Sequence, residues 1–90
     1  MVVMINKVTI KEVKIAIGNL CKNKRKEYKL TREQLAEELG LSRATIQNIE
    51  NGKNATLDNL LKIANHFNLL ETIFKAIVEL NTTNDNISLY

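Results

Sequence analysis

The sequence predicts a single all-α domain built from five helices. It contains no proline and three glycines, and so few chain breakers favour helices over a β-sandwich with many turns. Capping boxes, in which Ser or Thr is followed three residues later by Glu or Gln, mark two helix starts: Thr9 with Glu12, and Thr31 with Gln34. Apolar residues also recur at three- and four-residue spacing, which is the period of an amphipathic helix.

The size and composition of the chain limit what it can be. Ninety residues support one hydrophobic core and therefore one domain, residues 1–90. Apolar residues make up 44% and charged residues 26%, which is ordinary for a soluble globular protein. Cys21 is the only cysteine, which excludes an internal disulfide and fits a cytoplasmic setting. We expect neither a signal peptide nor a membrane span, because no apolar run is long enough.

Residues 1–9 precede the first expected helix. The β-branched segment "VVMINKVTI" fits either a short strand or a frayed arm. The helix itself is expected from Ile10 to about Tyr28, after the Thr9 cap. Its inward positions at helical spacing are Ile10, Val13, Ile17, Leu20, Cys21 and Lys24. We interpret Cys21 as a small core residue, with redox sensing as the alternative.

The second helix is expected over residues 32–39, because Thr31 supplies its N-cap. Its inward side chains are Leu35, Ala36 and Leu39. Gly40 ends this helix, since glycine adopts the left-handed conformation without steric cost. A third helix follows over residues 43–50, with Ser42 as its N-cap.

The third predicted helix has too thin an apolar edge to be buried on all sides. The apolar residues on its inner side are Leu41, Ile46 and Ile49. Its outward face carries Arg43, Ala44, Gln47 and Asn48. The sequence "NGK" at residues 51–53 predicts a turn after it.

The fourth helix begins after Thr56 or Asn54, either of which can serve as its N-cap. Its apolar side comprises Leu57, Leu60, Leu61, Ala64 and Phe67. Asn68 ends it, and "LLETIFKAIVEL" at residues 69–80 predicts a fifth helix. After that helix, "NTTND" predicts a polar loop and "NISLY" a short strand, so residues 81–90 are expected to be a flexible or strand-like arm. The core would then span about residues 10–80.

The fifth predicted helix carries a wider apolar stripe than one core contact needs. The stripe comprises Leu69, Leu70, Ile73, Phe74, Ile77, Val78 and Leu80. In a monomer of this size such a stripe leaves an exposed apolar patch, which usually marks an interface. We therefore predict a homodimer whose interface is formed by Leu70, Ile73, Phe74 and Ile77. The alternative is that the N-terminal arm or "NISLY" covers the stripe within one chain.

Three small or apolar positions predict how the second and third helices are joined. Ala36 is small where the next helix crosses above it, Gly40 turns the chain sharply, and Ile46 fills the joint. This is the packing of a helix-turn-helix, expected here over residues 32–51, whose second helix enters the DNA major groove.

The motifs "LTREQLAEELGLSRATIQNIENGK" and "TLDNLLKIANHFNL" follow one another along the chain. With them, roughly residues 15–69 resemble the phage repressor and Cro type, or Xre-like, helix-turn-helix DNA-binding protein. The resemblance implies a five-helix, lambda-repressor-like domain that binds double-stranded DNA. Residues 32–39 would be its positioning helix and residues 43–50 its recognition helix.

The resemblance also implies which residues touch DNA. Those expected at base edges are Arg43, Ala44, Gln47 and Asn48. Arginine can pair with guanine O6 and N7, asparagine can pair with adenine N6 and N7, and a thymine methyl can pack on Ala44 or Thr45. Those expected at phosphates are Arg32, Ser42, Thr45, Asn51, Lys53 and Asn54. Phosphate contacts orient a protein on DNA without reading its sequence.

Arg25 and Glu50 match a pair that, in the resembled family, joins the first helix to the end of the third. We predict this pair, with two unrelated surface charges as the alternative. Three features depart from the family's pattern, and one of them is that "NGKNATL" lacks the frequent proline before the fourth helix. Lys29 stands where glycine is frequent, which predicts either a left-handed lysine or a reshaped turn. Arg32 stands where glutamine is common, so its phosphate contact would be charged.

Charge is distributed unevenly along the chain. Residues 1–32 carry a net charge of +7 and residues 33–90 a net charge of −4, and the basic residues are densest in "KNKRKEYK" at residues 22–29. A one-sided basic patch suits a polyanion, because Lys and Arg displace counterions from phosphates. A solvated helix end is the alternative interpretation.

The sequence offers no catalytic constellation. His66 is the only histidine, and neither a carboxylate cluster nor a glycine-rich phosphate loop accompanies it. We expect no enzymatic activity, no catalytic residue, no metal and no cofactor.

The leading functional hypothesis is a transcriptional regulator, a repressor, at a pseudo-palindromic operator. It would act in the cytoplasm of a prokaryote or a phage-infected cell, associated with the nucleoid. The first alternative is an antitoxin that binds both a toxin protein and its own operator. The second is an interaction module that retains the fold without binding DNA.

Overall fold

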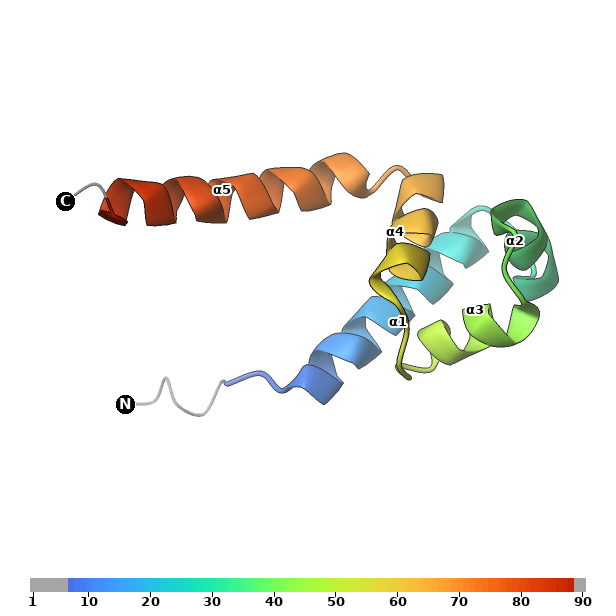
Figure 1. Ribbon diagram of the computed structural model, residues 1–90. Coiled ribbons are helices and arrows are strands. Elements are labelled where there is room, and N and C mark those ends of the chain that lie inside the picture. The colour runs from blue at the N-terminus through green and yellow to red at the C-terminus, as the bar shows by residue number, and fades with distance from the viewer. Residues whose placement is uncertain (1–6, 89–90) are drawn as a thin grey trace.

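The computed structural model describes residues 7–88, and side chains for residues 7–82. All regular structure in that range is helical (Figure 1). The elements are α1 (Ile10–Glu27), α2 (Arg32–Leu39), α3 (Arg43–Glu50), α4 (Leu57–His66) and α5 (Leu70–Ser88). The prediction of an all-α, five-helix fold is confirmed over these residues.

Both predicted capping boxes are present. At the start of α1, the Thr9 hydroxyl accepts from the Glu12 backbone N–H at 3.0 Å, and the Glu12 carboxylate accepts from the Thr9 N–H at 2.9 Å. Thr31 and Gln34 make the same exchange at the start of α2, at 3.0 and 2.8 Å. Each box pairs two backbone donors that a helix start leaves without partners.

Two further helices begin with a single side-chain cap. The Ser42 hydroxyl accepts from the Thr45 N–H at 3.0 Å and starts α3. Thr56, rather than Asn54, caps α4 by accepting from the Asn59 N–H at 3.1 Å. A short helix has few internal backbone hydrogen bonds, so its caps contribute a large share of its stability. This applies to α3, which has only eight residues.

Each of the first four helices ends with one residue in the left-handed conformation. These residues are Lys29, Gly40, Gly52 and Asn68, with φ values of 56°, 70°, 74° and 59°. In each case the next residue donates its N–H to a carbonyl five positions earlier, which is the Schellman arrangement. Of the two outcomes predicted for Lys29, the structure has the left-handed lysine. This conformation costs more free energy for lysine than for glycine, because lysine has a Cβ atom.

The core lies where α1, α2, α3 and α4 meet. Leu35 and Ile46 are fully buried, and Ile63 is 1% exposed. Ala36, Ile49, Phe67 and Cys21 complete the buried cluster. The predicted roles of Ala36 and Ile46 in packing α2 against α3, and of Cys21 in the core, are confirmed.

The predicted inward face of α1 is partly wrong. Ile10, Val13 and Leu20 are 78%, 46% and 46% exposed. The buried residues of this helix are instead Gly18, Cys21 and Arg25. The apolar side chains of α1 extend around more than one side of the helix, so spacing alone did not select the side that meets α3.

The apolar side of α4 also differs at two positions from the prediction. Leu57 is 71% exposed, whereas Ile63, which was not predicted, is buried. Leu57 is the first residue of α4, and the interhelix contacts form closer to the other end.

The last helix is longer than predicted. It continues to Ser88, so the polar loop at 81–85 and the strand expected from 86 onward are wrong as far as residue 88. Neither glycine nor proline follows Gly52, and Asn, Thr and Asp reduce helix propensity by only about 0.7 kcal/mol each or less. Residues 7–9 form no strand, and the rest of both predicted arms, 1–6 and 89–90, lies outside the described residues.

The body formed by α1 to α4 does not enclose α5. In Figure 1, α5 leaves the end of α4 and extends away from the other helices. The Cα radius of gyration is 15.9 Å, whereas a compact chain of this length has about 12 Å. The extension places most of the apolar stripe beyond the core, and only Leu69 at its start packs against the buried cluster.

Candidate nucleic-acid interface

The turn between α2 and α3 has the geometry that its sequence implies. Gly40 takes the left-handed conformation at φ 70°, and the Leu41 N–H donates to the Ala36 carbonyl at 2.9 Å. Leu41 is half-buried against the core, and Ile46 behind it is completely buried. The turn therefore holds α3 at a fixed orientation across α2.

One side of α3 is buried and the other faces solvent. Ile46, Ile49 and Glu50 are buried. On the opposite side Arg43, Ala44 and Asn48 are exposed and Gln47 is half-buried. The four residues expected at base edges thus lie on one accessible face of a helix whose back is fixed in the core.

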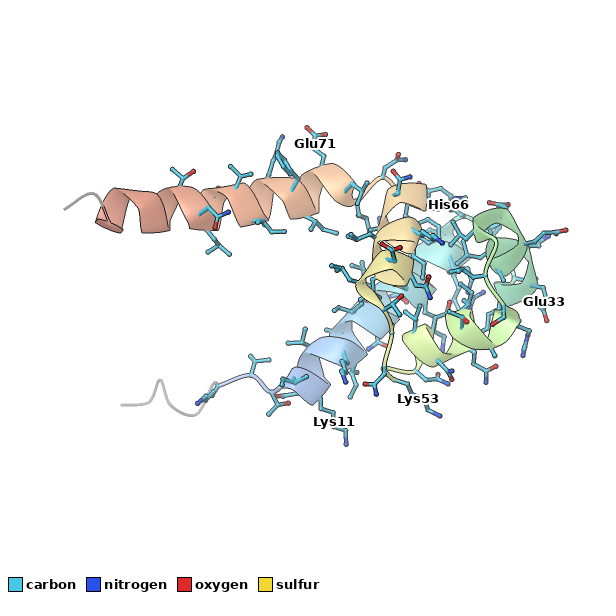
Figure 2. All side chains as sticks on the ribbon, viewed as in Figure 1. Lys11, Glu33, Lys53, His66 and Glu71 are labelled. Atoms are coloured by element: carbon cyan, nitrogen blue, oxygen red, sulfur yellow. The ribbon has the colours of Figure 1, made fainter. Side chains whose placement is uncertain are left out.

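Arg43 is held by two polar neighbours. Its Nε lies 2.7 Å from Oε2 of Glu33, and its Nη1 donates to Oε1 of Gln47 at 3.1 Å. Figure 2 shows Glu33 at the end of the molecule formed by α2 and α3. The pKa of Glu33 is lowered, first by its own backbone N–H and then by Arg43. Sequence analysis did not predict this partner, although Glu33 in the first turn of α2 is a favourable place for a carboxylate.

The residues expected at phosphates lie at two helix ends. Ser42 and Thr45 form the N-terminal end of α3, where their hydroxyls are 2.8 Å apart. Asn51 is the C-cap of α3. Lys53 and Asn54 follow in the α3–α4 turn and are exposed. Both groups of side chains flank the exposed face of α3, which is where donors to a DNA backbone are needed.

Arg32 is partly exposed and also takes part in a buried ion-pair network. Its Nε donates to Oε1 of Glu50 at 3.0 Å, and its side chain is 26% exposed. Its role at a phosphate remains a prediction.

Arg25 and Glu50 lie together in the interior. Arg25 donates from Nε to Oε2 at 2.7 Å and from Nη2 to Oε1 at 3.2 Å, and the two side chains are 9% and 1% exposed. The Arg25 Nη1 also donates to the Leu30 carbonyl at 2.8 Å. Burial tends to raise the pKa of Glu50, but hydrogen bonds from Arg25 and Arg32 outweigh it and lower that pKa. One carboxylate therefore joins α1, α2 and the end of α3.

The contact between α1 and α3 includes a glycine that sequence analysis missed. A Cβ atom at Gly18 would lie 2.5 Å from the Ile49 carbonyl oxygen and 2.7 Å from that of Glu50. The two backbones approach too closely for any side chain at this position. The only available signal was a glycine inside an otherwise helical pattern, which suggests close packing.

Other titratable groups fit structural roles. His66 lies 2.9 Å from Glu38 and thereby links α4 to α2, and its ring packs edge-on against Phe67. Burial raises the pKa of the Cys21 thiol to about 11. Within the described residues no group of three or more His, Cys, Asp and Glu could hold a metal ion. None of the described helices is both long and apolar enough for a membrane span.

Comparison with protein families gives a match. The family model described as Helix-turn-helix matches residues 22–74, which is more than half of the chain. No curated protein matches the sequence. The matched range contains α2, the turn and α3, together with the end of α1, the whole of α4 and the start of α5.

Proposed function

Because the chain belongs to the Cro/C1-type helix-turn-helix family of sequence-specific DNA-binding transcription regulators, we propose that it is a homodimeric repressor of a pseudo-palindromic operator. The observation that carries the proposal is the division of α3 into a buried side and a polar, accessible side. A helix of this kind can enter the major groove while its back remains packed on the body.

The accessible face supplies the chemistry for reading bases. Arg43 can make a bidentate pair with guanine, and Asn48 can do the same with adenine. Ala44 offers a small apolar surface for a thymine methyl, and Gln47 supports Arg43 through their hydrogen bond. On binding, Arg43 would exchange Glu33 for a guanine edge, since both are acceptors for the same guanidinium.

A second copy of the chain is the best occupant for the apolar surface of α5. Leu70, Ile73, Phe74 and Ile77 are 38%, 36%, 67% and 52% exposed. Beside the start of α5 lies a groove of about 350 Å³ lined only by apolar side chains of α1, α4, the α4–α5 junction and α5. A twofold dimer would place two recognition helices about 34 Å apart, one turn of DNA.

The experiment that tests the proposal is selection of bound duplexes from a random pool by the purified chain. Recovery of a two-fold symmetric sequence supports a dimeric reader, because each half-site is read by one copy of α3. Recovery of no enriched sequence would contradict sequence-specific binding. Placing the recovered sequence upstream of a reporter then separates repression from activation.

An antitoxin role is the second candidate, and the same exposed surface of α5 favours it. A toxin protein could cover the apolar stripe and groove in place of a second copy. The two proposals differ in the state of the purified chain, which is dimeric on its own only if a second copy is the occupant. In either role the protein would act in the cytoplasm at the nucleoid.

A further inference from the structure

The first half of α1 brings lysines to the α3–α4 turn. Lys14 is half-buried on α1, and Lys53 is exposed in the turn. Figure 2 shows Lys11 of α1 and Lys53 of the turn projecting from the same side of the molecule, below α1 and α3. Lys14 precedes residue 22, where the family match begins.

Close packing sets the distance between the turn and α1. A Cβ atom at Gly52 would lie 3.1 Å from Cγ1 and 3.2 Å from Cα of Ile15, so the turn rests directly on the helix. Next to this contact, the Lys14 ammonium donates a hydrogen bond to Oδ1 of Asn54. The turn is therefore connected to α1 by packing and by a polar contact.

Lys14 and Lys53 line the same small crevice. It has a volume of about 70 Å³, and its other lining residues are Ile17, Ile49, Ala55 and Leu60. No carboxylate lines it, and neither lysine has an ion pair among the described side chains. Two cationic side chains thus line one crevice, and a bound anion would offset the repulsion between their charges.

From this arrangement we propose that Lys14, Lys53 and Asn54 together bind one phosphate of the DNA backbone. The inference rests on the proposed function and adds Lys14, a residue of α1, to its contacts. Lys14 has three N–H donors and uses one on Asn54. Because Oδ1 of Asn54 accepts from Lys14, its amide N–H groups are directed away from Lys14 and toward solvent. Lys14 thus binds the phosphate and also positions Asn54.

The test is the salt dependence of affinity for two labelled duplexes, one recovered by selection and one of mixed sequence. Lys14→Gln and Lys53→Gln should each reduce the slope of log Kd against log salt, and the double variant should reduce it by about 0.9 in all, the value for one phosphate contact. Over a fourfold rise in salt, the double variant should lose about 3.5-fold less affinity than the wild type. Both duplexes should be affected equally, since a phosphate carries no sequence information.

Lys75→Gln is the matched control. It removes the same charge, but Lys75 pairs with Glu71 at 3.2 Å, and Glu71 projects from α5 on the other side of the molecule from Lys11 and Lys53 (Figure 2). It should keep the wild-type slope. Circular dichroism on every variant confirms that the fold is intact.

A double-mutant cycle tests the positioning of Asn54. If Lys14 and Asn54 act on one phosphate, Lys14→Gln combined with Asn54→Ala should weaken binding by less than the product of the two single effects. Multiplicative effects would show that the two residues act separately and would overturn the shared site.

The outcomes separate this inference from the proposed function. If the wild type binds neither duplex at low salt, the proposed function fails and the phosphate site fails with it. If the wild type binds but Lys14→Gln keeps the wild-type slope, DNA binding stands and the site is wrong. If Lys75→Gln reduces the slope of log Kd against log salt as much as Lys14→Gln does, the slope depends only on the net charge of the protein, and the site is again wrong.

Discussion

Glu50 shows how one residue can determine the orientation of a helix, here α3. Its carboxylate, 1% exposed, accepts from Arg25 of α1 and from Arg32 of α2. A buried ion pair adds little net stability, but removal of one partner leaves an uncompensated charge. We therefore infer that the main effect of the network is to fix the position of the end of α3 relative to α1 and α2.

We predict that Glu50→Gln destabilises the fold by roughly 3–5 kcal/mol at neutral pH, because Arg25 remains buried without its counterion. Urea unfolding measures the change. Glu37→Gln, at an exposed position of α2, is the matched control and should change stability by less than about 0.5 kcal/mol. Equal effects of the two substitutions would contradict a special role for Glu50.

The same residue predicts a dependence of stability on pH. The pKa of Glu50 in the folded chain lies below its ordinary value of 4.5. Its contribution is therefore fully present above that value and is lost as pH falls through the folded pKa. Urea unfolding between pH 7 and about pH 3 should show this loss in the wild type and a shallower one in Glu50→Gln. Identical pH profiles would assign the acid sensitivity to other carboxylates.

Arg43 is the residue on which base selectivity should depend most. Arg43→Ala is expected to weaken binding to the selected duplex by about 1–3 kcal/mol and to relax selectivity at one base pair. Titration of duplexes that vary at each position measures both effects. Lys75→Ala, on α5, should change neither. An equal loss on every duplex would move Arg43 from the base contacts to the phosphate contacts.

At the scale of elements, the contact between α1 and α3 depends on the absence of a side chain. Residue 18 faces the carbonyl groups of Ile49 and Glu50, which are the last residues of α3. Helix propensity favours alanine over glycine by about 1 kcal/mol, so propensity and packing oppose each other at this position. The distances below 3 Å indicate that packing dominates.

We expect Gly18→Ala to destabilise the fold by about 1–3 kcal/mol, as overpacking does elsewhere. The substitution should also weaken DNA binding, because α3 must move to make room. Thermal unfolding and duplex titration measure the two effects. Asn19→Ala, at the exposed neighbouring position, makes a matched control and should leave stability equal or slightly raised. If Gly18→Ala instead raised the stability of the fold, α1 and α3 would be able to move apart without a loss of free energy of unfolding.

The ends of the helices were the most predictable elements. Capping boxes at Thr9 and Thr31, and the left-handed residue Gly40, involve groups three or four positions apart, so local sequence contains all the information. The end of α5 was predicted wrongly for a related reason. The polar residues that follow Leu80 include neither glycine nor proline, so they can form a loop or a helix. The local sequence contains no signal that favours one over the other.

At the scale of the whole molecule, α5 extends from a body that is otherwise closed. From Leu70 to Leu80 its apolar side chains are exposed, and the apolar groove opens beside its first turn. Interfaces of stable dimers bury about 800 Å² of surface on each partner. A helix stripe together with a groove provides a larger surface than either feature alone.

In the proposed dimer, Ile77→Asp and Phe74→Asp should therefore each favour the monomer, because a buried unpaired charge opposes association. Sedimentation velocity measures the change. Lys75→Asp introduces the same side chain at a position that faces solvent and pairs with Glu71, and it should leave the dimer intact. A sedimentation profile unchanged by both apolar substitutions would remove α5 from the interface.

The sequence by itself determined the helices, most of their boundaries and the motif that they form. Caps, left-handed turns and three- and four-residue spacing are short-range properties, and the helix-turn-helix falls within one continuous segment, residues 32–51. The residues of α3 expected to face outward could be named for the same reason.

Only the tertiary structure decided which side of α1 is buried, that Gly18 meets α3, and that Arg32 joins the Arg25–Glu50 pair. It also brought Lys14 beside a turn 40 positions further along the chain. These features depend on how two separately predictable elements are oriented to each other. That orientation comes from the complementary shape of several side chains at once, and no periodic pattern in one segment records it.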